Sequence, residues 1–467
     1  MIGLLILLNV FFVSFKDKPA KSAPALSPRA LEQRQKWDIP IDALDYPVEK
    51  SYLDSLRKYG ATIHHTSRWF NGATCTIDNK DVEQIAQLPF VTNVETTRDN
   101  SPRGSFYARR RLPAMDESNA PQQPFEMLSD KQLALYNLLP LHEAGYHGQG
   151  ILITVCDGGF TQANTLAHFR QKQELGHFDF TDDPTDFYGE TGMHGTYCLG
   201  FISGLTDEYR GAATEADYYL MRSEEEDRES PKEMDNLVAA LEAADSVGTN
   251  VFTVSLGYFL FDNDDWSLDY SFMNGQATRS SRAALIAARK GMLVCAAAGN
   301  EGNDGWHWIS SPADADSILT VGAVDVNGKI GDFSSYGPSY DGRVKPEVCA
   351  VGVQATTLNL NGKTTRGNGT SFSTPLIAGL AATLWSALPE ENAMQIRERI
   401  IRSANRYNNP DRDQYGYGIP NAYAAYTGTT AITDNPLTAT SLKYIQGNTL
   451  YIFHNGKTYN ALGTLIH

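Results

Sequence analysis

The chain has 467 residues, 42% of them hydrophobic, and a formal net charge of −16 at pH 7. This length suffices for one large domain and one smaller domain. The acidic balance excludes nucleic acid as a partner, because a negatively charged protein repels a phosphate backbone. The five cysteines fit no zinc-ligand spacing, so we expect no metal in the chemistry. We expect them to be reduced, buried thiols, with a single disulfide as the alternative.

From the N-terminus, the first feature is an apolar stretch over Ile2–Phe15. It is too short to span a bilayer and is typical of the core of a signal peptide, although no Lys or Arg precedes it. Cleavage is expected near Ala20–Ala23, so we interpret residues 1–23 as a signal peptide. This interpretation predicts a protein that is secreted, periplasmic or held at the cell surface, with no membrane span.

A small module follows, which we place at residues 35–97. Its patterns predict, in order, a helix over 49–58, two strands within 61–77, a helix over 80–88 and a strand over 90–94. This α-β-β-α-β order is typical of a ferredoxin-like α+β fold. Such a fold needs one more strand before the first helix, and we expect that strand near residues 35–47.

The rest of the chain divides into a linker, a large domain and a tail. Residues 98–125 contain the run Arg109–Arg111 and several prolines, so we expect an exposed linker with processing sites. From 126 to 428, strand and helix patterns alternate, which predicts an α/β domain with a mostly parallel sheet and helices on both faces. Residues 429–467 are expected to form a linker and a β-hairpin that turns at Asn455-Gly456.

Four polar residues within the large domain lie next to apolar runs. Asp157 and Asn300 follow predicted buried strands, and His194 and Ser371 open predicted helices. A serine hydroxyl becomes a nucleophile when an imidazole accepts its proton and a carboxylate orients that imidazole. The carboxyl ends of parallel strands and the N-termini of helices are where such groups and a developing oxyanion gather. The pattern therefore predicts serine-based catalysis.

These segments, Asp-Gly-Gly, His-Gly-Thr, Ala-Gly-Asn and Gly-Thr-Ser-Phe-Ser-Thr-Pro, resemble in sequence and order the motifs of the subtilases, the subtilisin-like serine peptidases. The resemblance covers roughly residues 130–428. It implies a secreted serine endopeptidase that hydrolyses polypeptides. In the implied mechanism Ser371 is the nucleophile and His194 is the general base and acid. Asp157 orients the imidazole, and Asn300 donates to the oxyanion.

The resemblance also implies a substrate-binding surface and an inhibitor. One segment resembles the strand that pairs with the substrate backbone, and a second lies where the pocket for the residue before the cut is expected. The residues of these two segments are Ser255, Leu256, Gly257, Ala298, Gly299 and Glu301. Residues 67–72 and 88–91 resemble a subtilase propeptide, so the small module is expected to inhibit its own enzyme.

No cofactor is expected for the chemistry. Structural calcium is common among subtilases, but no EF-hand-like run supports a site. We expect the acidic run Glu224–Glu229 to be a solvated loop, with a cation site as the alternative. Two other functions remain open at this point. The first is a catalytically silent binding or scaffold protein on the same fold, which the intact triad disfavours. The second is an esterase or transferase that uses Ser371, which a peptide-versus-ester substrate panel would separate.

Overall fold

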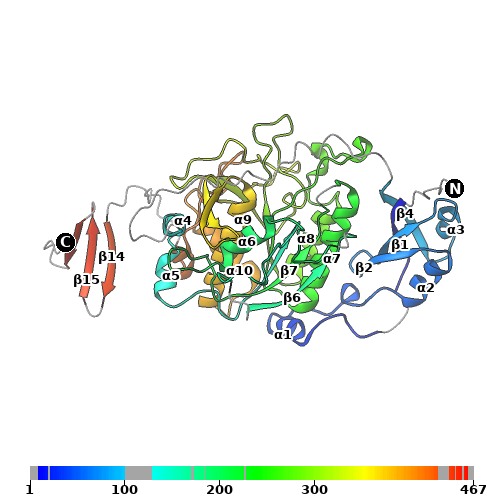
Figure 1. Ribbon diagram of the computed structural model, residues 1–467, viewed down its shortest axis with the longest axis horizontal. Coiled ribbons are helices and arrows are strands. Elements are labelled where there is room, and N and C mark those ends of the chain that lie inside the picture. The colour runs from blue at the N-terminus through cyan, green and yellow to red at the C-terminus, as the bar shows by residue number, and fades with distance from the viewer. Residues whose placement is uncertain are drawn as a thin grey trace.

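The computed structural model describes residues 9–18, 22–99, 129–169, 173–182, 185–225, 228–429, 441–446, 449–454 and 457–460. Figure 1 shows a large central domain, a small domain on its N-terminal side and a separate small sheet near the C-terminus. Within these residues, none of the helices combines the length and apolar character that a membrane crossing requires. The linker predicted at 98–125 lies, from residue 100 onward, outside the described residues.

The large domain is built on a seven-stranded sheet in the order β11-β10-β9-β8-β5-β7-β6, with all neighbours parallel. Its strands are β5 (Leu152–Asp157), β6 (Glu174–Asp179), β7 (Asp217–Arg222), β8 (Val251–Val254), β9 (Leu293–Ala297), β10 (Leu319–Val324) and β11 (Val348–Val351). The inner strands are apolar and buried, because both faces of the sheet are covered. Strand order reverses between β5 and β8, the place where open α/β sheets form their sites.

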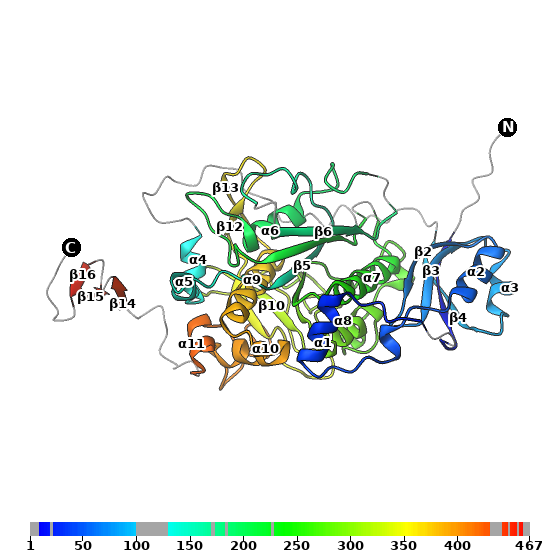
Figure 2. The same ribbon diagram turned by 90° about the horizontal axis from the view of Figure 1, so that it is seen from below.

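Helices cover both faces of this sheet (Figures 1 and 2), which confirms the predicted fold class. One face packs against α6 (His194–Ser203) and the buried helix α9 (Thr370–Ala387), and the other packs against α7 (Pro231–Val247) and α8 (Arg279–Arg289). The domain also contains α4 (Asp130–Leu135), α5 (Leu139–Glu143), α10 (Ala393–Arg402), α11 (Ala422–Thr427), two short 3₁₀ helices, η4 (Asp264–Trp266) and η5 (Tyr270–Phe272), and the antiparallel pair β12 (Ala355–Leu358) and β13 (Thr364–Gly367). All five cysteines are buried free thiols, as expected.

The N-terminal domain is a four-stranded antiparallel sheet in the order β2-β3-β1-β4 with helices on one face. Its elements are β1 (Asn9–Phe15), α2 (Lys50–Lys58), β2 (Thr62–Ser67), β3 (Gly72–Ile77), α3 (Val82–Ala86) and β4 (Val91–Arg98). This is the ferredoxin-like arrangement that the sequence predicts.

The first strand of this domain lies elsewhere than predicted. Residues 35–47 contain no strand; within them are the end of α1 (Pro28–Lys36) and the short 3₁₀ helix η1 (Ala43–Asp45). The missing strand is β1, which pairs with both β3 and β4. The signal-peptide interpretation of residues 1–23 is therefore wrong for β1, and the described part of the N-terminal domain begins with this strand rather than at residue 35. The error has a physical cause: both faces of β1 are buried, so its sequence is as uniformly apolar as a leader core.

Between β1 and α2 the chain leaves the N-terminal domain and crosses to the large domain. We call this segment, residues 16–49, the strap; it contains α1 and η1. Figure 2 shows α1 lying along the large domain rather than on the sheet of the N-terminal domain. At the other end of the chain, β14 (Ser441–Gln446), β15 (Thr449–His454) and β16 (Lys457–Asn460) form an antiparallel sheet. The predicted hairpin corresponds to β15 and β16, and β14 adds a third strand.

Candidate active site

The structure brings the four candidate residues to the carboxyl edge of the parallel sheet. Asp157 is the last residue of β5, and Asn300 lies three residues after the end of β9. His194 is the first residue of α6, and Ser371 is in the first turn of α9. These elements meet because α6 and α9 pack against each other and against the same face of the sheet.

Asp157 and His194 form a buried hydrogen-bonded pair. Asp157 Oδ1 lies 2.7 Å from His194 Nδ1, and the two side chains are 1% and 7% exposed. The glycine after the histidine permits this approach: a Cβ at Gly195 would lie 2.5 Å from the carbonyl oxygen of Gly159 and 2.9 Å from Asp157 Cβ. The His-Gly-Thr pattern thus has a steric reason as well as a chemical one.

Two opposing effects act on the His194 imidazole. Burial lowers its pKa, but the Asp157 carboxylate, assisted by the Cys198 thiol, outweighs burial and raises the pKa well above its usual value. Its other nitrogen, Nε2, is buried and has no hydrogen-bond partner. The ring is therefore held at Nδ1 while Nε2 remains able to exchange a proton, and the charged form is stabilised once the proton arrives.

Ser371 lies at the N-terminus of α9 and is 5% exposed. Its hydroxyl donates a long bond, 3.4 Å, to the carbonyl oxygen of Ser255, while the Ser255 hydroxyl donates to the Ser371 carbonyl oxygen at 2.9 Å. Catalytic hydrogen bonds are often loose before substrate binds, so this geometry is compatible with a nucleophile that turns toward His194. The helix N-terminus also leaves backbone N–H groups without intrahelical partners, where an oxyanion is favoured.

The Asn300 side chain is oriented by the residue before the serine. Its Oδ1 accepts hydrogen bonds from the backbone N–H of Thr370 (2.8 Å) and from the Thr370 hydroxyl (3.0 Å). With the oxygen fixed on Thr370, the amide Nδ2 is left as the donor. Sequence analysis did not identify Thr370 as a functional residue, although its place in the Gly-Thr-Ser motif was a usable signal.

Only some of the residues expected to form the pocket for the side chain before the cut lie together. Gly299 and Glu301 lie beside Ser335, whereas Ala298 is fully buried below them. The Glu301 carboxylate accepts from the backbone N–H of Asn300 (2.7 Å) and from the Ser335 hydroxyl (3.0 Å). It is thus bonded to its own loop and to the loop between β10 and β11, and does not simply extend toward solvent.

The strand expected to bind the substrate backbone is closely packed. Leu256 is nearly buried, and a Cβ at Gly257 would lie 2.2 Å from the Ser310 hydroxyl oxygen. The next residue, Tyr258, exchanges backbone hydrogen bonds with Ser311 at 2.7 and 3.2 Å. The segment Ser255–Gly257 is therefore held between Ser371 and the loop that follows Asn300.

One group of side chains that could bind a metal ion includes two residues of the candidate active site. Among the described residues, Asp157, His194 and Cys198 are the group whose ligating atoms lie within 4.8 Å of one another. The Asp157–His194 hydrogen bond already accounts for this proximity. In the predicted solvated loop, Glu225 instead pairs with Arg98 (3.0 Å) and Lys232 (2.7 Å).

Comparisons with known proteins agree with this geometry. Residues 148–418, more than half of the chain, match the Subtilase family, and residues 10–110 match the Peptidase S8 propeptide domain of Bacteroidota. Subtilisin NAT of Bacillus subtilis subsp. natto is 26% identical over 80% of this chain and 85% of its own length. Serine protease AprX of Bacillus subtilis (strain 168) is 28% identical over 60% of this chain and 67% of its own length. Subtilisin DY of Bacillus licheniformis is 30% identical over 60% of this chain and 92% of its own length.

The two matched regions also agree with the observed domains. The propeptide match begins within β1, as the pairing of that strand requires, and the subtilase match covers the seven-stranded sheet. A silent scaffold and an esterase or transferase are both less consistent with these relatives than a peptidase is. The chain therefore belongs to the subtilase family and is a serine endopeptidase with an N-terminal propeptide domain.

Proposed function

We propose that Asp157, His194 and Ser371 are the catalytic triad of this endopeptidase. The observation that carries the proposal is the buried 2.7 Å bond between Asp157 and His194 Nδ1, which lies against the helix that presents Ser371. Ser371 Oγ attacks the scissile carbonyl carbon while its proton passes to His194 Nε2. The same proton then passes to the leaving amine, and Asp157 stabilises the imidazolium between the two steps.

Asn300 and the backbone N–H of Ser371 are proposed as the oxyanion donors. The support for Asn300 is its fixed orientation, since Thr370 occupies the amide oxygen and leaves Nδ2 to donate. Donors that are positioned before the reaction stabilise the tetrahedral oxyanion without reorganising, and one such donor in subtilisin contributes about 10²–10³ in turnover.

The proposed substrate is an extended polypeptide that adds a strand beside Ser255, Leu256 and Gly257. Support comes from the position of this segment, because Ser255 hydrogen bonds to the main chain of Ser371. Gly299 and Glu301 are proposed to border the pocket for the side chain before the cut. We expect cleavage after large side chains, with pocket shape more important than charge.

The N-terminal domain is proposed to inhibit the enzyme until the linker is cut. Its position supports this role, because the end of β2 and the residues after it bond directly to α7: the Ser67 hydroxyl and the backbone N–H groups of Arg68 and Trp69 donate to Glu242 at 2.6 to 3.1 Å. An endopeptidase made in an inhibited form suits export, and we propose a secreted, periplasmic or cell-surface enzyme. The chemistry proposed here uses no cofactor; bound structural calcium remains a property to measure.

The decisive experiment is the variant Ser371→Ala. Peptide hydrolysis should fall by roughly 10⁶-fold, as for the equivalent change in subtilisin, and labelling by a fluorophosphonate probe should disappear. Ser386→Ala is the matched control, because this serine lies in the same helix and its hydroxyl donates to the carbonyl oxygen of Thr383. Residual activity above a tenth of the parent in purified Ser371→Ala would refute the assignment.

A further inference from the structure

The strap contacts the large domain at the C-terminal end of α7. The last carbonyl groups of a helix lack intrahelical partners and carry partial negative charge. In this structure the strap supplies the donors: Arg29 Nε and Gln33 Nε2 donate to the carbonyl oxygen of Gly248 at 3.1 and 2.9 Å. Gly248 has φ +83° and no Cβ, which allows the backbone of Ala30 to approach closely. Helix α1 therefore acts as an external cap on α7.

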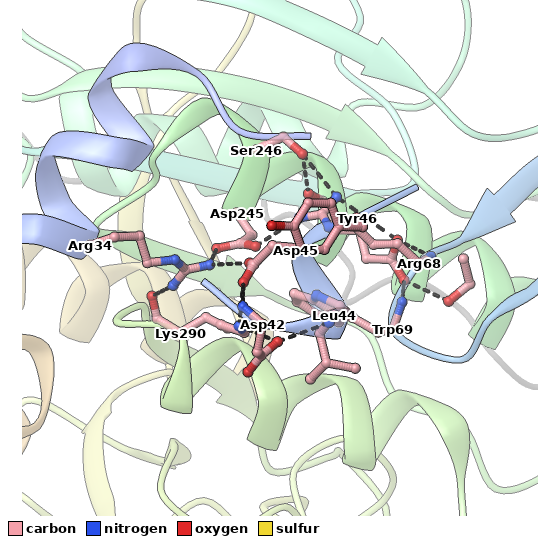
Figure 3. A network of polar contacts seen from close by, with 12 residues as sticks. Arg34, Asp42, Leu44, Asp45, Tyr46, Arg68, Trp69, Asp245, Ser246 and Lys290 are labelled. Carbon is pink, nitrogen blue, oxygen red and sulfur yellow. Dashed lines mark hydrogen bonds and ion pairs between the residues drawn. The ribbon is translucent and has the colours of Figure 1, made fainter. Parts of the chain in front are cut away.

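A buried ionic network fixes the strap beside this cap (Figure 3). Arg34, on α1, is 4% exposed and donates to Asp245 of α7 at 2.7 Å and to Asp45 of the strap at 3.1 Å. Asp45 is fully buried and pairs with Lys290, at the end of α8, at 2.7 Å; Lys290 also pairs with Asp42 at 2.9 Å. The strap thus places a positive charge, Arg34, against a negative charge of the large domain, and a negative charge, Asp45, against a positive one.

The network also connects the strap to the N-terminal domain. Arg68, which follows β2, donates to the second oxygen of Asp245 at 2.7 Å, so one carboxylate holds both the strap and this domain. Lys18, near the start of the strap, donates to the carbonyl oxygens of Ala43 and Tyr46, near its end. Lys18 also donates to the carbonyl oxygen of Arg68, which connects the strap to the N-terminal domain.

The geometry points to the strap as a second anchor of the N-terminal domain. We propose that it recognises the C-terminal ends of α7 and α8 and keeps the domain bound after the linker is cut. The contact through Glu242 involves the N-terminal domain itself, whereas the strap contact depends on Arg34, Asp45 and Lys290. Removing one partner from a buried, hydrogen-bonded charge pair mainly accelerates dissociation, because the other charge is left unpaired. Linker cleavage alone would then leave the complex intact, so under the proposed inhibitory role the enzyme would stay inhibited.

The test uses the full chain carrying Ser371→Ala, with the recognition sequence of an added, site-specific protease in place of residues 104–109. A fluorophore on Lys50→Cys, an exposed position of α2, labels the N-terminal domain, since the five native thiols are buried. After the linker is cut, the complex is diluted, and dissociation is followed as the fall in anisotropy when the labelled domain is released. The cut parent should dissociate slowly, and Arg34→Met should dissociate at least 30-fold faster. Arg57→Met is the control, because Arg57 is exposed and pairs with Asp54 on its own helix.

If Arg34→Met does not fold, Lys290→Met tests the same network from the large domain and leaves the N-terminal domain unchanged. Dissociation within threefold of the parent for whichever variant folds would overturn the second anchor. Inhibition is measured separately, on chains that retain Ser371. Fast dissociation of the variant together with an uninhibited parent complex would support the anchor while refuting the inhibitory role.

Discussion

Acidification should weaken the attachment of the N-terminal domain through His65. This residue is in β2, and its buried ring faces Lys232 and Asn236 of α7. Burial, together with the nearby charge of Lys232 and the neighbouring His64, lowers the pKa of His65 from 6.5 to about 3. In the dissociated state the ring is open to water, whether or not the domain stays folded, and its pKa returns to about 6.5.

The magnitude follows from this difference. A bound-state pKa below the free-state pKa means that the free domain binds the proton more tightly. The attachment is therefore at full strength above pH 6.5 and weakens as the pH falls from 6.5 toward 3. Each pH unit in this window costs a factor of ten in affinity, so pH 5 should weaken binding about 30-fold, or about 2 kcal/mol. Asp182, which faces His64 and Lys232, should not contribute in this window: burial raises its pKa, but these two partners outweigh burial and lower it strongly.

The assay is the affinity of the linker-cut Ser371→Ala complex at pH 7.5, 6.5, 5.5 and 5.0. His65→Gln keeps a polar side chain of similar size that does not titrate, so its affinity should change much less over the same range. The difference between the two profiles isolates His65 from every other titrating group. A parent profile that changes less than threefold between pH 6.5 and 5.0, or an equally steep profile in His65→Gln, would refute the reasoning.

Two further predictions concern the active site. Asn300→Ala should lower kcat by about 10²–10³ with little change in KM, because the lost donor acts on the transition state. Steady-state kinetics on a peptide substrate measures both constants. A raised KM at constant kcat would show that Asn300 only binds substrate. Glu301→Gln should reduce cleavage after Lys or Arg by less than about tenfold, because exposed charge pairs are worth ~0–1 kcal/mol and this carboxylate is already bonded to Ser335. Cleavage of a peptide library at low and high salt measures this preference. Complete loss of cleavage after Lys or Arg in Glu301→Gln would show that charge, rather than pocket shape, determines it.

The candidate site could be located from sequence because its residues follow local patterns. Asp157 and Asn300 follow apolar runs that are strands in the structure, and Ser371 opens a helix whose apolar sequence is unmistakable. What could not be predicted depends on packing between distant segments. The orientation of Asn300 by Thr370 requires the three-dimensional contact of α9 with the segment after β9. The bond between Glu301 and Ser335 requires the approach of the loop that lies between β10 and β11.

The N-terminal domain shows how two structural features can together hide a strand. An isolated ferredoxin-like sheet has one polar face, and its strands alternate apolar and polar residues. In β1 both faces are apolar: Phe11 and Val13 pack toward α2 and α3, while Phe12, on the opposite face, is covered by the Arg279 guanidinium of α8 at 4.5 Å. That second face is apolar because a partner domain covers it.

The strap removes the remaining clue to the position of β1. In a ferredoxin-like fold the first strand is expected directly before the first helix. Here residues 16–49 separate β1 from α2, and α1 and η1 within this segment bind the large domain. A domain that began at residue 35 would lose the strand that joins β3 to β4. The apolar second face and the strap thus share one property, since both contact the large domain. A strand that is apolar on both faces, as β1 is, and a long segment between that strand and the next helix should accordingly be interpreted together. Together they indicate a domain that folds against a partner domain.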